Sequence, residues 1–217
     1  MAGTTVNENN VVYKTLRKAI NQAGYDFTLD QVLAEGAGKE KLKAIKDILH
    51  SQNGGENIQL ANSIYQNFIV MLALAYQNLE IKPIEGAEEL FHQLKKKNIL
   101  VVLNTGYNEE TARTLLNKLR WEEGGIIDGL VTASDVVQNR PQPDMILFAM
   151  KKFGIQDAHE VIKVGDSMID IEEGANAGCY LNIGITTGAH TYEQLLSAHP
   201  DLIIHNLLDL LPALDKN

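Results

Sequence analysis

The sequence has a single cysteine, Cys179, among its 217 residues, so an internal disulfide is excluded. Cys179 follows a glycine in an apolar segment, which indicates a small buried strand residue rather than a nucleophile. Positive charge is also scarce. The formal net charge is −9, which argues against general affinity for nucleic acid. A small anionic substrate is still compatible with this charge, because a metal and a few basic side chains reverse the field locally.

Long apolar runs and export signals are missing as well. The most apolar stretch, 68–76, is too short to span a bilayer, and the N-terminus lacks the basic-then-apolar pattern of a signal peptide. Together with the lone cysteine, these absences predict a cytoplasmic protein with no membrane and no nucleic-acid partner. The sequence also has no Gly-x-Ser-x-Gly elbow, and its six histidines show no spacing typical of metal ligands.

The hydrophobic share of 45% and the length suit one domain, or a core domain with a smaller inserted one. Residues 10–80 have helical periodicity throughout. Val12, Leu16 and Ile20 share one face of the first helix, and Gly24 is placed to end it. Further helices are expected over 29–36, 41–52 and 58–79.

The pattern changes after Pro83, where apolar strand-like segments alternate with helical ones. This alternation predicts an α/β fold with a parallel sheet that is covered by helices on both faces. Such sheets place their sites at the carboxyl ends of the strands. The loops there carry Thr-Gly turns, one arginine and two aspartates, which are the groups that a phosphate site with a metal needs. The expected strands lie at 99–106, 125–134, 160–166, 180–188 and 201–205.

Three segments, VVLNTGYN, NRPQPD and KVGDSMIDIEEGANAG, resemble in order and spacing the motifs of the haloacid dehalogenase-like hydrolase superfamily. The closest resemblance is to its phosphonatase-like branch, named for phosphonoacetaldehyde hydrolase, and it covers nearly the whole chain. It implies a Rossmann-like core of residues 1–7 and 81–217 with a helical cap inserted at 8–80. It also implies a Mg²⁺-dependent hydrolase that acts on a small phosphonate or phosphate metabolite through an aspartyl-phosphate intermediate.

The resemblance also assigns roles to single residues. It implies that the Thr105 hydroxyl binds the phosphoryl group and that Arg140 is the cation on that group, where most relatives have lysine. Asp166 is implied as a Mg²⁺ ligand and Asp170 as a second-shell or water-bridged partner of the metal. The two aspartates are four residues apart at a helix start, so both are able to face one ion. The remaining implied residues are Ala2 at the metal, and Gly3, Thr4, Gly106 and Tyr107 at the substrate, with the backbone N–H groups of Gly3 and Thr4 on the phosphoryl oxygens.

The opening MAGTT matches the family's first motif, Asp-x-Asp/Ala-Gly-Thr, from its second position onward. By the resemblance, the nucleophilic aspartate and the central strand that carries it would directly precede Met1. Neither is in the sequence as given, which is therefore expected to be inactive or severely impaired.

Ala2 stands at the next position of the motif. By the resemblance, phosphatases have a second aspartate there, which protonates the leaving alkoxide, and phosphonatases have alanine. In a phosphonatase a cap lysine forms an imine with the substrate aldehyde, so no such acid is needed. Ala2 and Arg140 together favour the phosphonatase branch.

The family pattern for the imine-forming lysine is Gly-x-x-Lys at the start of a cap helix, and it fits here in two registers. Lys41 follows Gly38, and Lys39 follows Gly36. We favour Lys41, because the apolar positions of the helix then fall in phase with the family's helix. The alternative is that these lysines form a solvated helix face. The cap departs from the namesake enzyme, which has Met, His and Cys at the positions of Ala37, Ala44 and Asn10.

Two other functions are compatible with the same residues. One is a phosphomonoesterase of the same fold, whose cap lysines only bind substrate anions. The other is a non-catalytic relative that has lost its nucleophile. The stretch 68–76 is expected to pack the cap's own core, and the alternative is that it joins two copies of the chain in a homodimer.

Overall fold

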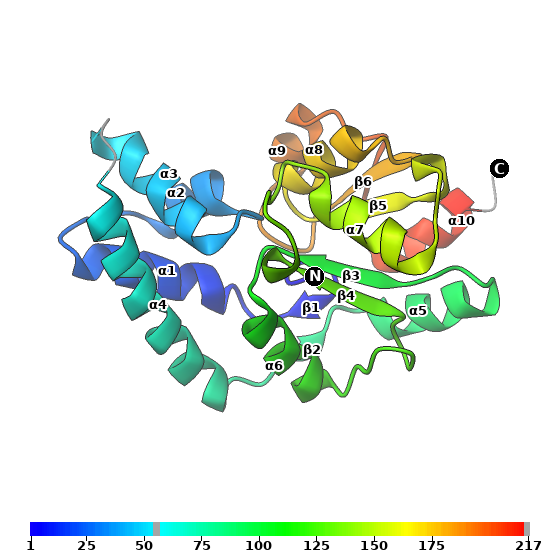
Figure 1. Ribbon diagram of the computed structural model, residues 1–217, viewed down its shortest axis with the longest axis horizontal. Helices are drawn as coiled ribbons and strands as arrows, with labels where there is room; N and C mark the ends of the chain where they lie inside the picture. Colours follow the sequence, from blue (N-terminus) through cyan, green and yellow to red (C-terminus); the bar gives the residue numbers. More distant parts are fainter. Residues whose placement is uncertain (54–56, 215–217) are drawn as a thin grey trace.

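Four helices at the start of the chain pack against one another as one lobe, which we call the cap (Figure 1). The computed structural model describes residues 1–53 and 57–214. The helical periodicity predicted for 10–80 is confirmed over the described part of that range. The cap helices are α1 (Val11–Gln22), α2 (Leu29–Gly36), α3 (Lys41–Asn53) and α4 (Ile58–Asn78).

Local signals in the sequence fix the ends of these helices. The Thr28 hydroxyl accepts a hydrogen bond from the backbone N–H of Gln31, and the Gln31 side chain accepts one from the backbone N–H of Thr28. This reciprocal capping box begins α2. Gly24 lies just beyond α1 with φ +96°, a conformation that glycine adopts without strain. Val12 and Leu16, on the predicted face of α1, are fully buried.

The rest of the chain alternates strands with helices, as predicted. The elements are β2 (Lys82–Pro83), α5 (Ala87–Lys96), β3 (Val102–Thr105), α6 (Glu109–Leu119), β4 (Gly129–Thr132), η1 (Ala133–Asp135), α7 (Asp144–Phe153), η2 (Ala158–Glu160), β5 (Ile162–Gly165), α8 (Met168–Ala177), β6 (Leu181–Ile185), α9 (Tyr192–Ser197), β7 (Leu202–Ile204), η3 (Leu207–Asp209) and α10 (Leu210–Leu214).

Cys179 is buried, as predicted, but it lies in the link between α8 and β6, so its predicted place in a strand is wrong.

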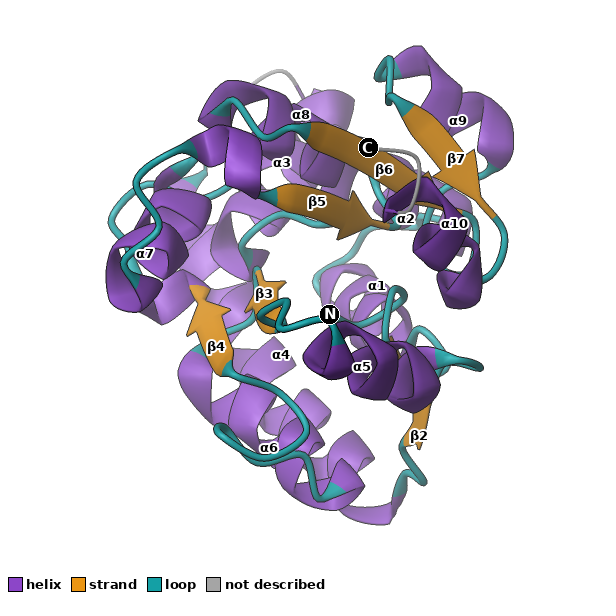
Figure 2. Cartoon of the chain, turned by 90° about the vertical axis from the view of Figure 1, so that its right-hand side faces the viewer, coloured by secondary structure: helices purple, strands orange, loops and turns teal. Residues whose placement is uncertain are grey.

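The parallel strands form two sheets instead of the single sheet that the alternation predicts. β3 pairs with β4 in one sheet, and β5, β6 and β7 pair in that order in the other. Figure 2 shows the N-terminus between them. The amino group of Met1 donates to the Asn104 carbonyl at 3.3 Å. Thr105 at the end of β3 and Asp166 just after β5 line the same pocket, so the two sheets present their carboxyl ends to one site. The predicted α/β class is confirmed.

The chain passes between the cap and the sheets at an antiparallel ribbon. β1 (Val6–Asn7) pairs with β2, with Val6 opposite Pro83 and Asn7 opposite Lys82. The first crossing leads into α1 and the second leads out of α4. The domain boundaries expected at 7/8 and 80/81 fall at this ribbon, and they stay a prediction.

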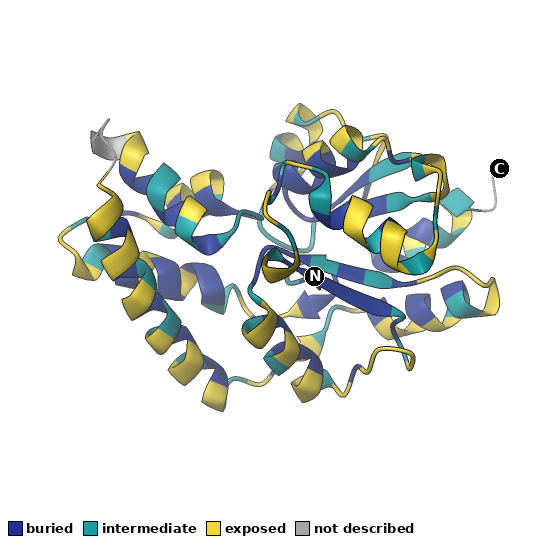
Figure 3. Cartoon of the chain, viewed as in Figure 1, coloured by how far each residue is buried: buried dark blue, intermediate teal, exposed yellow. Residues whose placement is uncertain are grey.

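α4 is longer than its apolar centre. The segment Ile58–Gln77 is, within residues 1–53 and 57–214, the single helix that is long and apolar enough to cross a membrane. The helix predicted over 58–79 is confirmed, whereas the expectation that the most apolar stretch is too short to span a bilayer considered only its centre, 68–76. The same test is passed by core helices of soluble proteins, so one such helix is weak support for a span. Phe68 and Leu72 are buried, whereas Val70 and Leu74 are exposed, and Figure 3 shows buried and exposed residues mixed along α4.

Candidate active site

The loop between α2 and α3 brings the cap onto the core. Gly38 in this loop has φ +74°, and its N–H donates to the Tyr13 hydroxyl at 2.9 Å. A Cβ at Gly38 would run into Ile169 and Ser167 of the core. On the core side, a Cβ at Gly106 would lie 2.7 Å from the Gly38 carbonyl oxygen. Glycine at both positions therefore permits backbone contact between cap and core, and it places the start of α3 next to the end of β3.

A small pocket, which we call the polar pocket, lies beneath this loop at the carboxyl ends of β3 and β5. Thr105, Arg140 and Asp166 are buried in its walls. Most of the residues that the sequence singled out therefore converge here, from segments far apart in the chain. The lining residues are Met1, Ala2, Tyr13, Gly38, Lys41, Thr105, Gly106, Tyr107, Arg140, Asp166, Ser167 and Asp170.

Four buried charged side chains, Arg140, Lys163, Asp170 and Glu173, form an ion network at one wall of the polar pocket. Arg140 Nη1 lies 2.8 Å from Asp170 Oδ1, and Arg140 Nε lies 3.0 Å from Glu173 Oε2. Lys163 Nζ lies 3.0 Å from Asp170 Oδ1 and 2.7 Å from Glu173 Oε2. Although burial opposes it, Arg140 and Lys163 hold the pKa of Asp170 below its ordinary value. The two positive and two negative side chains of this network compensate each other's charge, and such pairing is what allows charged groups to be buried.

Asp166 is held by hydrogen bonds from both sides. Thr4 Oγ1 donates to Asp166 Oδ1 at 2.7 Å, and the backbone N–H of Ala189 donates to Oδ2 at 2.9 Å. Burial, and after it the nearby charge of Asp170, raises the pKa of Asp166. Gly3 has φ +80°, and a Cβ there would run into the Asp166 carboxylate. The Gly-Thr turn at the start of the chain thus fits closely around Asp166.

Gly3 and Thr4 lie behind Asp166 rather than in the lining of the polar pocket, which differs from the expectation. The N–H of Gly3 donates to the Val6 carbonyl at 2.9 Å, and the N–H of Thr4 donates to the Met1 carbonyl at 3.2 Å. The turn therefore uses both donors internally, and neither is directed at a phosphoryl group.

The residues expected at Mg²⁺ fit a site with few protein ligands. Asp166 and Asp170 line the polar pocket, as does Ala2, which offers only its backbone carbonyl. Within the described ranges, no three His, Cys, Asp or Glu side chains are placed to hold a metal. Mg²⁺ commonly takes one or two carboxylates and keeps several waters. Burial, and after it the charge of Asp170, raises the pKa of Asp166, and a bound cation would favour its ionised form. The donor set is therefore compatible with Mg²⁺.

Lys41 begins α3 and places its ammonium group at the boundary of cap and core. Its Nζ donates to the Lys39 carbonyl at 2.6 Å and lies 5.1 Å from the ring centroids of both Tyr13 and Tyr107. The residue is 6% exposed. Burial lowers the pKa of Lys41 to about 8, although Glu40 opposes the shift. An amine with a pKa near neutrality is suited to nucleophilic attack on a carbonyl.

Lys39, which fits the family pattern in the other register, has different surroundings. Its Nζ forms an ion pair with Asp47 Oδ2 at 2.6 Å, and its side chain is 22% exposed. Lys39 is absent from the polar pocket's lining. The geometry therefore favours Lys41 over Lys39 as the lysine of the site.

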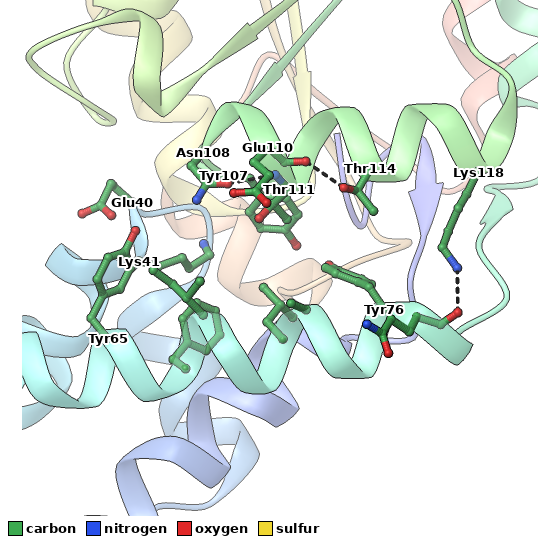
Figure 4. A pocket seen from close by; sticks show the side chains of 16 residues that line it. Glu40, Lys41, Tyr65, Tyr76, Tyr107, Asn108, Glu110, Thr111, Thr114 and Lys118 are labelled. Atoms are coloured by element: carbon green, nitrogen blue, oxygen red, sulfur yellow. Dashed lines mark hydrogen bonds between the residues drawn. The ribbon is translucent and has the colours of Figure 1, made fainter.

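A larger cavity of about 300 Å³ lies between α4 and α6 and reaches the same lysine (Figure 4). We call it the α4–α6 cavity. Phe68 and Leu72 of α4 line one wall, and Thr111 of α6 lines the other. Lys41 and Tyr107 belong to the walls of both this cavity and the polar pocket. The two cavities are therefore neighbours with a shared boundary.

A family model described as haloacid dehalogenase-like hydrolase matches residues 1–182. The chain belongs to this family. The match covers the cap, the loop of Lys41 and the segments that carry Thr105, Arg140 and Asp166. The chain is accordingly a member of a family of hydrolases.

Several similar proteins are named phosphonoacetaldehyde hydrolase. A phosphonoacetaldehyde hydrolase of Parabacteroides distasonis is 29% identical over 179 residues, which is 78% of this chain and 66% of the relative. That of Hahella chejuensis is 32% identical over 127 residues, 58% of this chain and 42% of the relative. The matches span less than two thirds of either relative. A phosphonoacetaldehyde hydrolase-like protein of Oleispira antarctica shares the fold, with a TM-score of 0.83 at 24% identity over 99% of this chain and 88% of that one. The relationship to the phosphonatase-like branch is thus confirmed.

Several residues of the site were not expected from the sequence. Lys163 had a readable signal, because it is a charged residue in an otherwise apolar strand, whereas Glu173 stands in a polar stretch of α8 with Asp170 and Glu172. Glu8 had none: it lies in the polar run NENN, yet it is 3% exposed, and its Oε2 accepts from the Val12 N–H at 3.1 Å. Burial raises the pKa of Glu8 to about 7. Glu8 also helps to raise the pKa of the buried Tyr76 and Tyr107, for which burial is the larger cause.

Proposed function

We propose that the protein is a Mg²⁺-dependent phosphonatase-like hydrolase that cleaves the P–C bond of a small phosphonate bearing a carbonyl group. The observation that carries this proposal is the placement of Lys41. Its amine is buried between two tyrosine rings, its pKa is lowered to about 8, and it lines the pocket that also contains Thr105 and Arg140. Roughly one tenth of such an amine is neutral at pH 7.

In the first step, the neutral amine of Lys41 attacks the carbonyl carbon of the substrate. A C–N bond forms, and the carbonyl oxygen takes up the two protons of the amine and leaves as water. One further proton from the solvent gives the protonated imine. The imine carbon lies one carbon away from phosphorus. When the P–C bond breaks, its electron pair moves toward the iminium nitrogen and leaves an enamine. The departing carbon therefore needs no acid, which suits the alanine at position 2.

The polar pocket receives the phosphonyl group. The Thr105 hydroxyl and the Arg140 guanidinium would bind its oxygens, and the ion pairs of Arg140 with Asp170 and Glu173 keep that guanidinium in position. Asp166 and the Ala2 carbonyl would hold Mg²⁺, with Asp170 as a second-shell or water-bridged partner, and the bound ion would reduce the negative charge of the phosphonyl oxygens. In the family's motif the phosphoryl acceptor is an aspartate one position before the residue that Met1 matches, and Met1 itself lines the pocket.

Borohydride trapping tests the role of Lys41 without requiring P–C cleavage. The chain is incubated with phosphonoacetaldehyde and borohydride, and the modified peptide is identified by mass spectrometry. We expect one adduct on Lys41, a trapping rate that rises with pH to half its maximum near pH 8, and a loss of at least about a hundredfold in Lys41→Ala. Lys39→Ala is the matched control and retains the adduct.

The alternative function gives a different result. Phosphate release from simple phosphate esters that is insensitive to borohydride, with no adduct on Lys41, would establish a phosphomonoesterase and overturn the proposal. Turnover itself is assayed with Mg²⁺ in a form of the chain that has an aspartate directly before Met1. The cytoplasmic location and the homodimer through 68–76 stay predictions.

A further inference from the structure

Lys41 stands at the junction of two cavities with different chemistry. Lys41, Gly106 and Tyr107 line both the polar pocket and the α4–α6 cavity. A substrate carbonyl bonded to Lys41 therefore has room on two sides. The phosphonyl group fits on the side of Thr105 and Arg140. Whatever else is attached to the carbonyl carbon faces the gap between α4 and α6 (Figure 4).

The size of the α4–α6 cavity exceeds the needs of a two-carbon aldehyde. Its volume of about 300 Å³ is at the lower end of the range for small-molecule sites and equals the liquid volume of about ten water molecules. The organic part of phosphonoacetaldehyde has only three non-hydrogen atoms, and its carbonyl carbon bears hydrogen on the side that faces the cavity. That substrate would leave most of the cavity without a contact.

The walls of the cavity indicate what it would accept. The α4 wall is apolar and aromatic, with Phe68, Leu72 and Tyr76. The α6 wall has the hydroxyl groups of Thr111 and Thr114, which tolerate the edge of an apolar group as well as a water.

Charged groups lie at the two ends of the cavity. Glu40, next to Lys41 in the sequence, lines the cavity at the end of this lysine, and Glu110 lines the α6 side, so their carboxylates disfavour an acidic substituent (Figure 4). At the other end, Lys118 donates to the Leu79 carbonyl at 3.0 Å, so its charge is already engaged. These features select an uncharged, largely apolar group.

We propose that the substrate is a β-ketophosphonate whose carbonyl carries an apolar alkyl or aryl substituent, and that this substituent lies in the α4–α6 cavity. The inference rests on the proposed function, because it takes Lys41 as the imine-forming residue. It adds the class of substrate: a phosphonate ketone with an apolar tail in place of a bare aldehyde. Burial of a phenyl-sized group in such a cavity is expected to strengthen binding by about tenfold or more.

Two ketones with the same carbonyl chemistry test this inference. The first is acetonylphosphonate, which has a methyl group on the carbonyl. The second is its homologue with a phenethyl group in place of the methyl. Borohydride trapping on Lys41 is measured by mass spectrometry over a range of concentrations of each, with phosphonoacetaldehyde in parallel. We expect the phenethyl ketone to reach half-maximal trapping at about tenfold lower concentration than the methyl ketone.

A matched pair of variants on α4 locates the tail. Ala73 and the adjacent Leu74 are both exposed, but Ala73 lines the rim of the α4–α6 cavity and Leu74 does not. Ala73→Trp should fill part of the cavity and bring the ratio of the two half-maximal concentrations close to one. Leu74→Trp should keep the ratio of the wild-type chain. Thermal unfolding of both variants checks that each is folded before the ratio is compared.

The outcomes separate the two proposals. Equal trapping of the two ketones at Lys41, or a preference that persists in Ala73→Trp, would overturn the assignment of the cavity and leave the imine chemistry in place. Absence of any adduct at Lys41 with all three carbonyl compounds would overturn the proposed function, and the inference with it.

Discussion

The polar pocket and the α4–α6 cavity share Lys41 but are built in opposite ways. The polar pocket is formed largely by strand ends and loops of the core, and ion pairs and hydrogen bonds fix its charged groups. The cavity is formed mainly by α4 of the cap and α6 of the core, with Lys41 and the loop of Gly106 and Tyr107 at one end, and its α4 wall is largely apolar and aromatic. The first region is suited to one chemical group, the phosphonyl. The second recognises mainly shape and apolar surface, so it determines which phosphonate is accepted.

The largest effect should come from removing a charge at the wall of the polar pocket. Glu173→Ala leaves Arg140 and Lys163 with fewer partners in a buried site, and we expect a loss of about 3–5 kcal/mol in the free energy of unfolding. Urea denaturation measures this value. The exposed neighbour Glu172 supplies the control, since Glu172→Ala should change stability by no more than about 0.5 kcal/mol. Equal effects of the two substitutions would contradict the idea that charge holds this region together.

A second prediction concerns Glu8, which is buried and lies close enough to Tyr76 of the cavity and Tyr107 of both regions to act on them electrostatically. Its pKa is raised to about 7, so the folded protein binds the proton more tightly than the unfolded chain does. Its contribution to stability is therefore full below about pH 4.5 and is lost as the pH rises through 7. Glu8→Gln should thus be more stable than the wild-type chain above pH 8, by on the order of 3 kcal/mol, and nearly equal to it at pH 4.5.

Denaturation at the two pH values measures this difference. Glu35→Gln, at an exposed position of α2, should show no pH-dependent gain. Burial lowers the pKa of Lys41, and the negative charge of Glu8 opposes this shift. Glu8→Gln should therefore move the half-maximal pH of imine trapping to a lower value. If the stability difference is the same at both pH values, the burial of a titrating Glu8 is not its cause.

The smallest effect is expected from the metal. Mg²⁺ that binds the folded chain should raise its thermal unfolding midpoint. The free energy of unfolding should increase by about 1–2 kcal/mol at a Mg²⁺ concentration of roughly ten to twenty times Kd. Asp166→Asn should remove this gain, whereas Asp157→Asn, at an exposed position, should keep it. A gain that survives Asp166→Asn would place the ion outside the polar pocket.

Much of the fold could be predicted because its signals are local. Thr28 and Asn108 cap helices where the sequence indicated, since a capping side chain and the backbone N–H that donates to it lie within a few residues of each other. The alternation of apolar strand-like segments with helical segments after Pro83 predicted where the strands lie. The division into two sheets could not be predicted, because periodicity identifies strands without fixing which of them pair.

The site was predictable only in part for the same reason. Thr105, Arg140 and Asp166 stand in segments whose order and spacing resemble a family, and they do meet in one pocket. The choice between Lys39 and Lys41 rests on contacts with Tyr13 and Tyr107, which are distant in sequence. The α4–α6 cavity is likewise formed by helices that no local pattern brings together.

The account's central claim is that one lysine joins a phosphonyl site to an apolar cavity. A crystal structure of the borohydride-reduced adduct with the phenethyl ketone tests it most directly. We predict a C–N bond at Lys41 Nζ, the phosphonyl oxygens within hydrogen-bond distance of Thr105 and Arg140, and the phenyl ring against Phe68 and Leu72. An adduct on another lysine, or a phosphonyl group outside the polar pocket, would contradict the account.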